Sequence, residues 1–158
     1  IYDVSHNIAK IEDHQVHGKN CKCCVHRKGA TRALGGDHVE LANRFSGIGQ
    51  PVLVPGDMGT ASWVLAGPKK GSNEAFSSSC HGAGRRLSRT AARNSIDSEQ
   101  LKKNLEEKGI YVNVKTPNVL SEEAPEAYKN VDEVIDLTHK AELARPVARL
   151  KPFAVIKG

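Results

Sequence analysis

The sequence predicts an α+β fold, and three observations lead to that prediction. Short apolar segments, each bounded by glycine or proline, are typical of strands connected by glycine-rich loops. Two later segments repeat apolar residues at helical spacing. The 158 residues are 39% hydrophobic, enough to bury one core, and they contain no internal repeat and no low-complexity tail.

The predicted strands are short and follow the apolar segments along the chain. The first residues, Ile1–Val4, resemble the middle of a strand. The segment Ile110–Val114 has the alternating pattern of a strand. The predicted strands are Val25–Arg27, Pro51–Val54, Ser62–Ala66, Ile110–Val114 and Phe153–Ile156.

The most convincing helix signal covers Ser98–Lys108. Leu101 and Leu105 lie one turn apart, and either Asp97 or Ser98 can cap the N-terminus. Gly109 is suited to ending the helix. Two other segments have a helical pattern, Arg86–Arg93, which is basic, and Val131–Ala141.

Charge and composition favour a polyanionic partner over a membrane. The formal net charge is +5, the isoelectric point is about 9.1, and the basic residues cluster near the glycine-rich segments. A solvated basic surface is the alternative explanation. Aromatic residues make up only 4%, so base stacking is not expected to be a major binding mode. No stretch could span a bilayer and no signal-peptide pattern is present, so we expect a cytoplasmic protein without a membrane partner.

One histidine has a setting suited to phosphate chemistry. His81 follows the small residues 77–80 and precedes the turn Gly82-Ala83-Gly84. Glycines allow backbone N–H groups to close on a phosphate, and the start of a following helix would add positive potential. Arg85 and Arg89, one helical turn apart in the predicted pattern, could supply charge-assisted hydrogen bonds. The alternative is a buried histidine in a tight strand-to-helix turn.

Two other segments have the composition of ligand-binding loops. In the loop 55–62, Gly56 and Gly59 remove side-chain obstruction and would allow the backbone to approach a ligand. An ordinary turn between two strands is the alternative. His6, expected to follow a strand and to lie beside Asn7, could ligate a divalent ion, although such a histidine is often structural.

A basic cluster occurs near residue 30. Arg27, Lys28 and Arg32 surround Gly29 and could contact RNA phosphates. A solvated strand end would have the same composition. The pattern alone therefore leaves both interpretations open.

Five motifs lie at residues 3–10, 25–33, 50–67, 77–85 and 155–158. Taken together and in order, they resemble the C-terminal part of the RtcB family of tRNA-splicing RNA ligases. The resemblance runs from the first residue to the last. It implies an RtcB-like fold of mostly antiparallel β-structure with flanking helices. It also implies that residues 1–158 are the C-terminal part of the catalytic domain, without the N-terminal half that carries most metal ligands.

The resemblance implies a GTP- and manganese-dependent RNA ligase. Such an enzyme joins RNA 3′-phosphate or 2′,3′-cyclic phosphate ends to 5′-hydroxyl ends through a histidine-guanylate intermediate. The implied cofactors are GTP and two manganese ions. The implied partners are RNA, as tRNA half-molecules or broken ends, and an archease-type activator. By itself the fragment is expected to be inactive, because one ligand holds manganese weakly.

The resemblance also assigns roles to individual residues. His81 is the nucleophile, His6 is a manganese ligand, and Asn7 lies beside the guanylate. Lys157 contacts guanine, and Ser62 hydrogen-bonds the nucleotide. The rest of the implied nucleotide pocket is Pro55, Gly56, Asp57, Met58, Gly82, Ala83 and Gly84, and the implied RNA-phosphate contacts are Lys28, Arg85 and Arg89.

The cysteine-rich segment departs from the family pattern. Cys21 and Cys24 have C-x-x-C spacing, Cys23 lies between them, and His14 and His17 precede them. A zinc-stabilised interaction module is therefore one alternative function. A catalytically inactive fragment that binds RNA or a nucleotide is another. No second C-x-x-C pair exists, which favours local variation over a zinc site.

Overall fold

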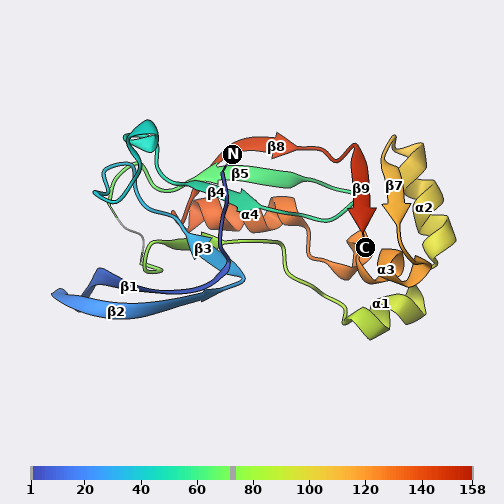
Figure 1. The fold of residues 1–158 in the computed structure, drawn as a ribbon, viewed down its shortest axis with the longest axis horizontal. Coiled ribbons are helices and arrows are strands. Elements are labelled where there is room, and N and C mark those ends of the chain that lie inside the picture. The colour runs from blue at the N-terminus through green and yellow to red at the C-terminus, as the bar shows by residue number, and fades with distance from the viewer. Residues whose placement is uncertain (1, 72–73, 158) are drawn as a thin grey trace.

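The computed structural model describes residues 2–71 and 74–157, and it has a mixed α and β architecture with mostly antiparallel strands. Figure 1 shows two halves joined by several connections. Each half has its own buried hydrophobic cluster. One surrounds Val52, Val54 and Leu65, and the other surrounds Leu105 and Leu120.

A long hairpin begins the first half. Strands β1 (Asn7–Val16) and β2 (Lys19–Lys28) pair antiparallel, with Asn7 opposite Lys28. Side chains alternate between two faces, as in any strand, and one face of the hairpin is half-buried against the molecule. On that face Arg27, only 2% exposed, forms a bidentate ion pair with Glu12.

Two further sheets complete this half. The short strands β3 (Ala30–Arg32) and β6 (Ser78–Cys80) pair antiparallel. A three-stranded antiparallel sheet has the order β4-β5-β8, and its apolar residues pack against helix α4. Its elements are β4 (Pro51–Val54), β5 (Ser62–Ala66), β8 (Arg145–Leu150) and α4 (Val131–Lys140), and a 3₁₀ turn, η1 (Asn43–Phe45), precedes them.

The second half is mainly helical. Helix α2 (Ser98–Glu107) begins after Asp97, whose carboxylate accepts the N–H groups of residues 99 and 100. Leu101 and Leu105 face the core, as their spacing predicts. The final strand returns from the first half and pairs parallel with β7, which places the chain end beside α3. The other elements are α1 (Arg89–Ser95), β7 (Tyr111–Val114), α3 (Pro117–Glu122), η2 (Pro125–Ala127) and β9 (Ala154–Lys157).

The β4–β5 loop helps to join the halves. Met58, at its tip, is 5% exposed and belongs to the hydrophobic cluster of the second half. A Cβ added at Gly59 would lie 2.8 Å from Pro125 Cγ, so the loop packs closely on η2. This loop is therefore part of the core as well as a candidate binding loop.

Several predicted elements are confirmed with small shifts at their ends. Helix α2 covers the predicted helix 98–108, and α4 covers the predicted helix 131–141. The predicted strands 51–54, 62–66, 110–114 and 153–156 correspond to β4, β5, β7 and β9. The predicted strand 25–27 is the end of the much longer β2.

Three local predictions are wrong. The described residues 2–5 form no strand, and His6 precedes β1 instead of following a strand. Arg85 and Arg89 do not share a helical turn, because α1 begins only at Arg89. Its N-cap is Ser88, whose hydroxyl accepts the N–H of residue 91.

In the part of the chain that the structure describes, no helix is both long enough and apolar enough to cross a membrane.

Candidate active site

Two histidines from distant parts of the sequence meet where three strands end. His6 precedes β1, and His81 follows β6. Gly29 joins them, because its N–H donates to the carbonyl of His6 at 3.0 Å and its carbonyl accepts the N–H of His81 at 3.2 Å. The two imidazole rings stack with centroids 4.2 Å apart and planes 12° apart. The β1–β2 hairpin and the β3–β6 pair thus create the contact.

The environment of His81 favours the neutral imidazole. Burial, followed by the positive charge available to His6, lowers the pKa of His81 below its usual value. The backbone of Leu53 opposes this shift, but no group in the described residues completes a hydrogen bond to Nδ1, which is buried. Because Nδ1 is buried, Nε2 is the candidate ring nitrogen for contact with a substrate.

The turn after His81 contains two left-handed glycines. Gly82 has φ of 153° and Gly84 has φ of 78°, and between them Ala83 is buried in the core. The positive φ angles at both positions explain why glycine occurs at each end of the Gly-x-Gly sequence. The expected helix start is not beside His81, so α1 does not supply positive potential there.

The Pro55–Ser62 loop lies beside this turn. A Cβ at Gly82 would be 3.7 Å from the carbonyl oxygen of Pro55. Within the loop, the N–H of Gly56 donates to Ser62 Oγ at 3.3 Å. Asp57 accepts hydrogen bonds from the N–H of Gly59 and the hydroxyl of residue 60, at 2.8 and 2.7 Å. The structure therefore brings the predicted nucleotide loop and the His81 turn together, while burying Met58 in the core.

Lys157 lies in a second cluster, built around Glu123. Lys157 Nζ is 3.9 Å from one carboxylate oxygen of Glu123, and Arg85 Nη1 is 3.2 Å from the other. Tyr128 donates its hydroxyl to Glu123 at 2.5 Å and receives a hydrogen bond from Arg85 at 2.9 Å. Burial, then the hydrogen bond and charge of Glu123, raise the pKa of Tyr128. Parallel pairing of β9 with β7 positions Lys157 for this contact.

The three predicted RNA-phosphate residues lie on different elements. Lys28 ends the hairpin, opposite Asn7. Arg85 donates to two backbone carbonyls, of Leu87 and Glu122, besides its contacts in the Glu123 cluster. Arg89 begins α1, and its side chain lies 3.8 Å from Glu122.

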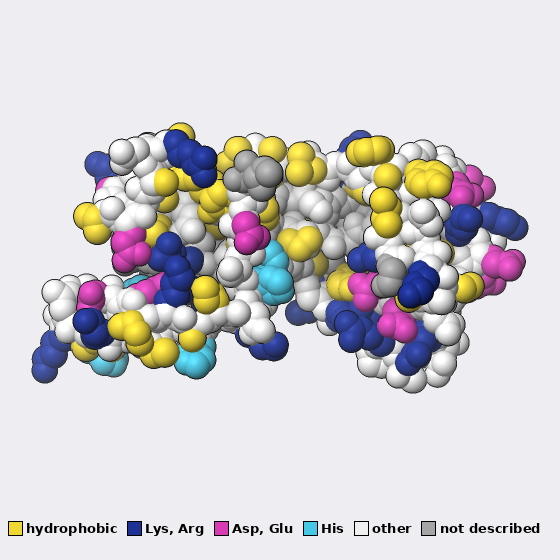
Figure 2. Space-filling model, in the orientation of Figure 1, with side chains coloured by type: hydrophobic (Ala, Val, Ile, Leu, Met, Phe, Trp, Pro, Cys, Tyr) yellow, Lys and Arg dark blue, Asp and Glu magenta, His cyan; other side chains and the backbone are white. Residues whose placement is uncertain are grey.

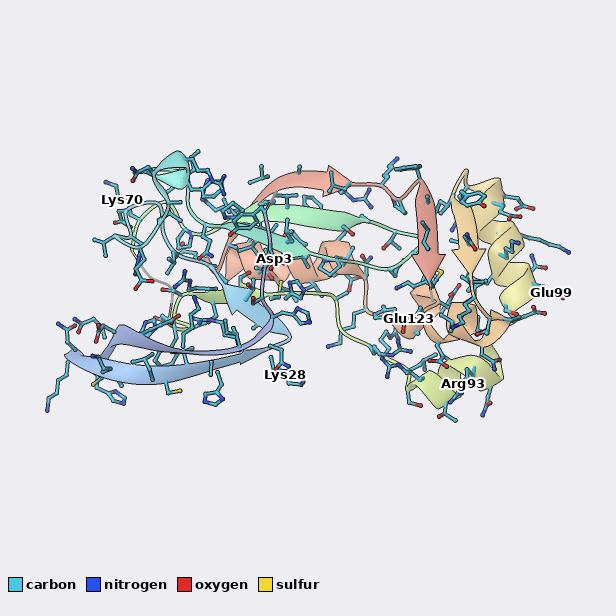
Figure 3. The ribbon with its side chains drawn as sticks, in the orientation of Figure 1. Asp3, Lys28, Lys70, Arg93, Glu99 and Glu123 are labelled. Atoms are coloured by element: carbon cyan, nitrogen blue, oxygen red, sulfur yellow. The ribbon has the colours of Figure 1, made fainter. Side chains whose placement is uncertain are left out.

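The figures show where Lys28 and helix α1 lie on the molecule. Figure 3 shows Lys28 at the end of the hairpin and Arg93, another α1 arginine, on a separate part of the molecule. Figure 2 shows basic side chains over α1 and at both ends of the hairpin on the face drawn. The structure therefore places the predicted phosphate contacts on different elements and does not gather them at one point.

The cysteine-rich segment lies within β2. Cys21 and Cys24 are three residues apart on one strand, so their side chains point to opposite faces. Cys24 Sγ lies 3.4 Å from His26 Nε2 on the exposed face. Among the described residues, no group of three histidine, cysteine or acidic side chains could hold a metal ion. The C-x-x-C spacing thus has no metal-binding geometry in this strand.

Comparison with known proteins identifies the family. A sequence model of the family described as tRNA-splicing ligase RtcB matches residues 1–158. The chain belongs to the RtcB family. It is 52% identical over 158 residues to each of the tRNA-splicing ligases RtcB of Archaeoglobus fulgidus and Thermococcus kodakarensis. It is 46% identical to the RNA-splicing ligase RtcB homolog 1 of Entamoeba dispar.

The chain spans only part of these RtcB relatives. All 158 residues align, but they cover 33% of each of the two archaeal proteins and 30% of the Entamoeba protein. The family supports an RNA ligase, and the chain corresponds to about a third of such a protein.

Sequence reasoning missed Glu123 and Tyr128. Their partner Arg85 is 38 and 43 residues away, so no local spacing signals the contact. The one available hint is the adjacent pair of acidic residues at 122 and 123, each of which binds an arginine. Such pairs are common on solvated helices, which is why the hint does not identify a site.

Proposed function

We propose that this chain supplies the nucleophilic histidine and part of the nucleotide pocket of a GTP-dependent RNA ligase. The enzyme joins RNA 3′-phosphate or 2′,3′-cyclic phosphate ends to 5′-hydroxyl ends, in tRNA splicing and RNA repair. The observation that carries the proposal is His81, a neutral imidazole whose Nδ1 is buried and whose neighbours are a glycine turn and the Pro55–Ser62 loop.

In the first step, Nε2 of His81 attacks the α-phosphorus of GTP. A nitrogen–phosphorus bond forms, the bond to pyrophosphate breaks, and a histidine-guanylate remains. A lowered pKa suits this role because it keeps the nitrogen lone pair free near neutral pH. Burial of Nδ1 supports Nε2 as the attacking nitrogen.

In the later steps, RNA takes the guanylate and is sealed. A 3′-phosphate oxygen attacks the guanylate phosphorus, His81 leaves, and an activated RNA end forms. The 5′-hydroxyl of the second RNA then attacks that end and releases GMP. A 2′,3′-cyclic phosphate must first be opened to a 3′-phosphate. Imidazole serves well both as nucleophile and as leaving group.

The other site residues bind and orient in this proposal. Lys157 and Ser62 contact the nucleotide, and Asn7 lies near the guanylate. The remaining pocket residues, Pro55, Gly56, Asp57, Met58, Gly82, Ala83 and Gly84, contribute mainly backbone. Lys28 and Arg89 contact RNA phosphates. Arg85 shares that role in the sequence prediction, but its contacts to Glu123 and Tyr128 suit it equally to positioning.

Manganese is part of the proposal, although the described residues do not form a complete site for it. His6 is exposed and could serve as one ligand, but no three-residue ligand group exists among the described residues. Bound manganese would stabilise charge on the transferred phosphate. A functional site therefore needs ligands from outside residues 1–158.

The proposed partners are RNA, as tRNA half-molecules or broken ends, GTP, and an archease-type activator. A cytoplasmic location fits these partners. The alternative is an inactive fragment that binds RNA or a nucleotide.

The experiment is guanylylation of the full-length protein that contains this chain. The protein is incubated with GTP labelled at the α-phosphate and with manganese, then denatured and examined for covalent label. His81→Ala should abolish the label, and His139→Ala, which alters an exposed histidine of α4, should leave it unchanged. Label that persists in His81→Ala would show that another residue is the nucleophile.

A further inference from the structure

A large cleft lies between the two halves, apart from His81. Its volume is about 840 Å³, and neither histidine of the candidate active site lines it. Two connections between the halves form its walls, the segment from η2 to α4 and the segment from β8 to β9. The tip of the β4–β5 loop and the end of α2 complete it. The charged residues that line it include Asp57, Arg86, Lys108, Lys129, Asp132 and Lys151.

The cleft has an excess of uncommitted positive charge. Five basic and three acidic side chains line it. Four of the basic residues form no ion pair within the described residues 2–71 and 74–157: Arg86, Lys108, Lys129 and Lys151. A concave surface with unpaired cations attracts polyanions.

Two of the three acidic residues are already occupied. Asp132 accepts two hydrogen bonds from Arg149, at 3.0 and 2.8 Å, and one from Trp63 at 2.8 Å. The hydrogen bond from Arg149, helped by that from Trp63, holds the pKa of Asp132 below its usual range against the effect of burial. Asp57 is held by its own turn, through Gly59 and Thr60. Neither carboxylate is therefore free to neutralise the other cations.

The arrangement of these cations suits a chain of phosphates better than a single phosphate. The four unpaired residues come from four separate segments, and all four are exposed. Exposed lysines and arginines spread along a trough neutralise successive phosphodiesters without reading the bases. The apolar wall at Ile110, Pro125 and Pro152 offers surface for ribose or base edges.

The cleft is also close to the proposed reaction centre along the chain. The five residues from Gly82 to Arg86 connect His81 to the cleft, and five residues span at most about 17 Å when fully extended. The β4–β5 loop provides a second link, because Pro55 lies beside Gly82 and Asp57 lines the cleft. An RNA end at His81 could thus have nucleotides a few positions away in the cleft.

We propose that this cleft binds the phosphodiester backbone of single-stranded RNA a few nucleotides away from the end that reacts at His81. The identity of the anion as RNA rests on the proposed function, whereas the anionic character of the ligand rests on the charges alone. Binding is independent of sequence and sensitive to salt, because it depends on backbone charge.

The test uses the full-length protein carrying Lys129→Gln and Lys151→Gln together. Binding is measured with a 3′-phosphate RNA of about 15 nucleotides and with one of three nucleotides. The double variant should bind the long RNA about tenfold more weakly, and the slope of log K against log salt should fall by about 1.4, or 0.7 for each lost contact to a single strand. Binding of the short RNA and guanylylation by GTP should change less than twofold.

The matched control is Lys102→Gln with Lys103→Gln. These two exposed lysines of α2 do not line the cleft, and their loss changes the net charge by the same amount. The control should bind both RNAs like the wild type. A second cleft variant, Arg86→Gln, should reproduce the selective loss of long-RNA binding, which guards against misfolding of the double variant.

Three results would overturn the proposal. Long-RNA binding equal to that of the wild type would show that the cleft does not hold RNA. Equal losses for long and short RNA would place the lysines at the reacting end. A higher GTP concentration for half-maximal guanylylation, with RNA binding intact, would make the cleft a nucleotide site. Failure of the proposed function is distinguishable, because a wild-type protein that binds RNA but is never guanylylated would refute the ligase and leave the cleft intact.

Discussion

Replacing Glu12 by glutamine should loosen the β1–β2 hairpin, because it leaves a buried guanidinium without its counter-ion. The side chains of Arg27 and Glu12 are 1% and 8% exposed, and two hydrogen bonds of 2.9 and 2.7 Å join them. Arg27 also donates to Ser78 Oγ and to the carbonyl of Phe76, both at 2.8 Å. The pair therefore ties the hairpin to the segment that leads to His81.

Breaking a buried pair by removing one partner costs about 3–5 kcal/mol. Glutamine keeps one oxygen acceptor, so we expect Glu12→Gln to cost about 3 kcal/mol of local stability. Each 1.4 kcal/mol corresponds to a factor of about ten, so backbone amides of β1 and β2 should exchange with deuterium about 100-fold faster. Hydrogen exchange with mass spectrometry on the full-length protein measures this directly.

The control is Asp13→Asn, an adjacent carboxylate on the exposed face of β1. It should change hairpin exchange less than threefold. The double change Glu12→Leu with Arg27→Met should cost less than Glu12→Gln, because no buried charge then remains unpaired. Exchange in Glu12→Gln within threefold of wild type would refute the argument.

The same ion pair predicts a dependence on pH. Burial raises the pKa of Glu12, but hydrogen bonds from Arg27 and His14 and the charges of Arg27 and Arg32 outweigh it, so the pKa is lowered overall. A carboxyl whose pKa is lowered by folding stabilises the protein above its unfolded pKa, about 4.3, and loses that contribution as pH falls through the folded value. The difference in exchange between wild type and Glu12→Gln, after correction for intrinsic rates, should therefore shrink as pH falls below about 4.

Three other predictions concern activity. Residues 1–158 alone should show no ligation and negligible GTP-dependent labelling, and robust turnover by this chain would refute the need for metal ligands from elsewhere. In the full-length enzyme, Lys28→Ala and Arg89→Ala should each cost about 1–3 kcal/mol in the RNA-dependent step and should lower the salt sensitivity of RNA binding. Guanylylation should change less. Equal losses in both steps would indicate contacts to GTP phosphates instead. Gly56→Ala should slow guanylylation strongly, because the new Cβ would lie 1.7 Å from the carbonyl oxygen of Ala61 and force the loop to move; an unchanged rate would show that the loop does not shape the nucleotide pocket.

Residues close together in the sequence were sufficient to predict helix α2 and the turn after His81. Helix α2 has its cap at Asp97, its apolar pair at Leu101 and Leu105, and Gly109 with φ of 77° after its end, and all four are readable within 13 residues. The Gly-x-Gly turn after His81 was also predictable, because positive φ angles favour glycine.

The β1–β2 hairpin illustrates what the sequence conceals. Both strands alternate, but the half-buried face of the hairpin mixes Glu12, His14 and Arg27 with its apolar residues. Hydrophobic periodicity cannot detect a face buried through ion pairs and hydrogen bonds. The sequence also does not reveal that His6 stacks on His81. That contact depends on backbone hydrogen bonds of Gly29 to both histidines, which no side-chain pattern indicates.

A basic side chain is available to a phosphate only if ion pairs and hydrogen bonds within the protein do not already hold it. A cluster of basic residues in the sequence does not reveal those contacts. Arg85 and Lys28 seemed equivalent in the sequence, yet the structure gives Arg85 a carboxylate, a phenol and two backbone carbonyls as partners. Lys28 takes part in none of the ion pairs found among the described residues. An RNA phosphate could bind Lys28 without displacing anything, whereas it would have to compete with Glu123 for Arg85. The structure therefore leaves the Lys28 ammonium without an ion-pair partner among the described residues, whereas it commits Arg85 to Glu123, the carboxylate that Lys157 also contacts.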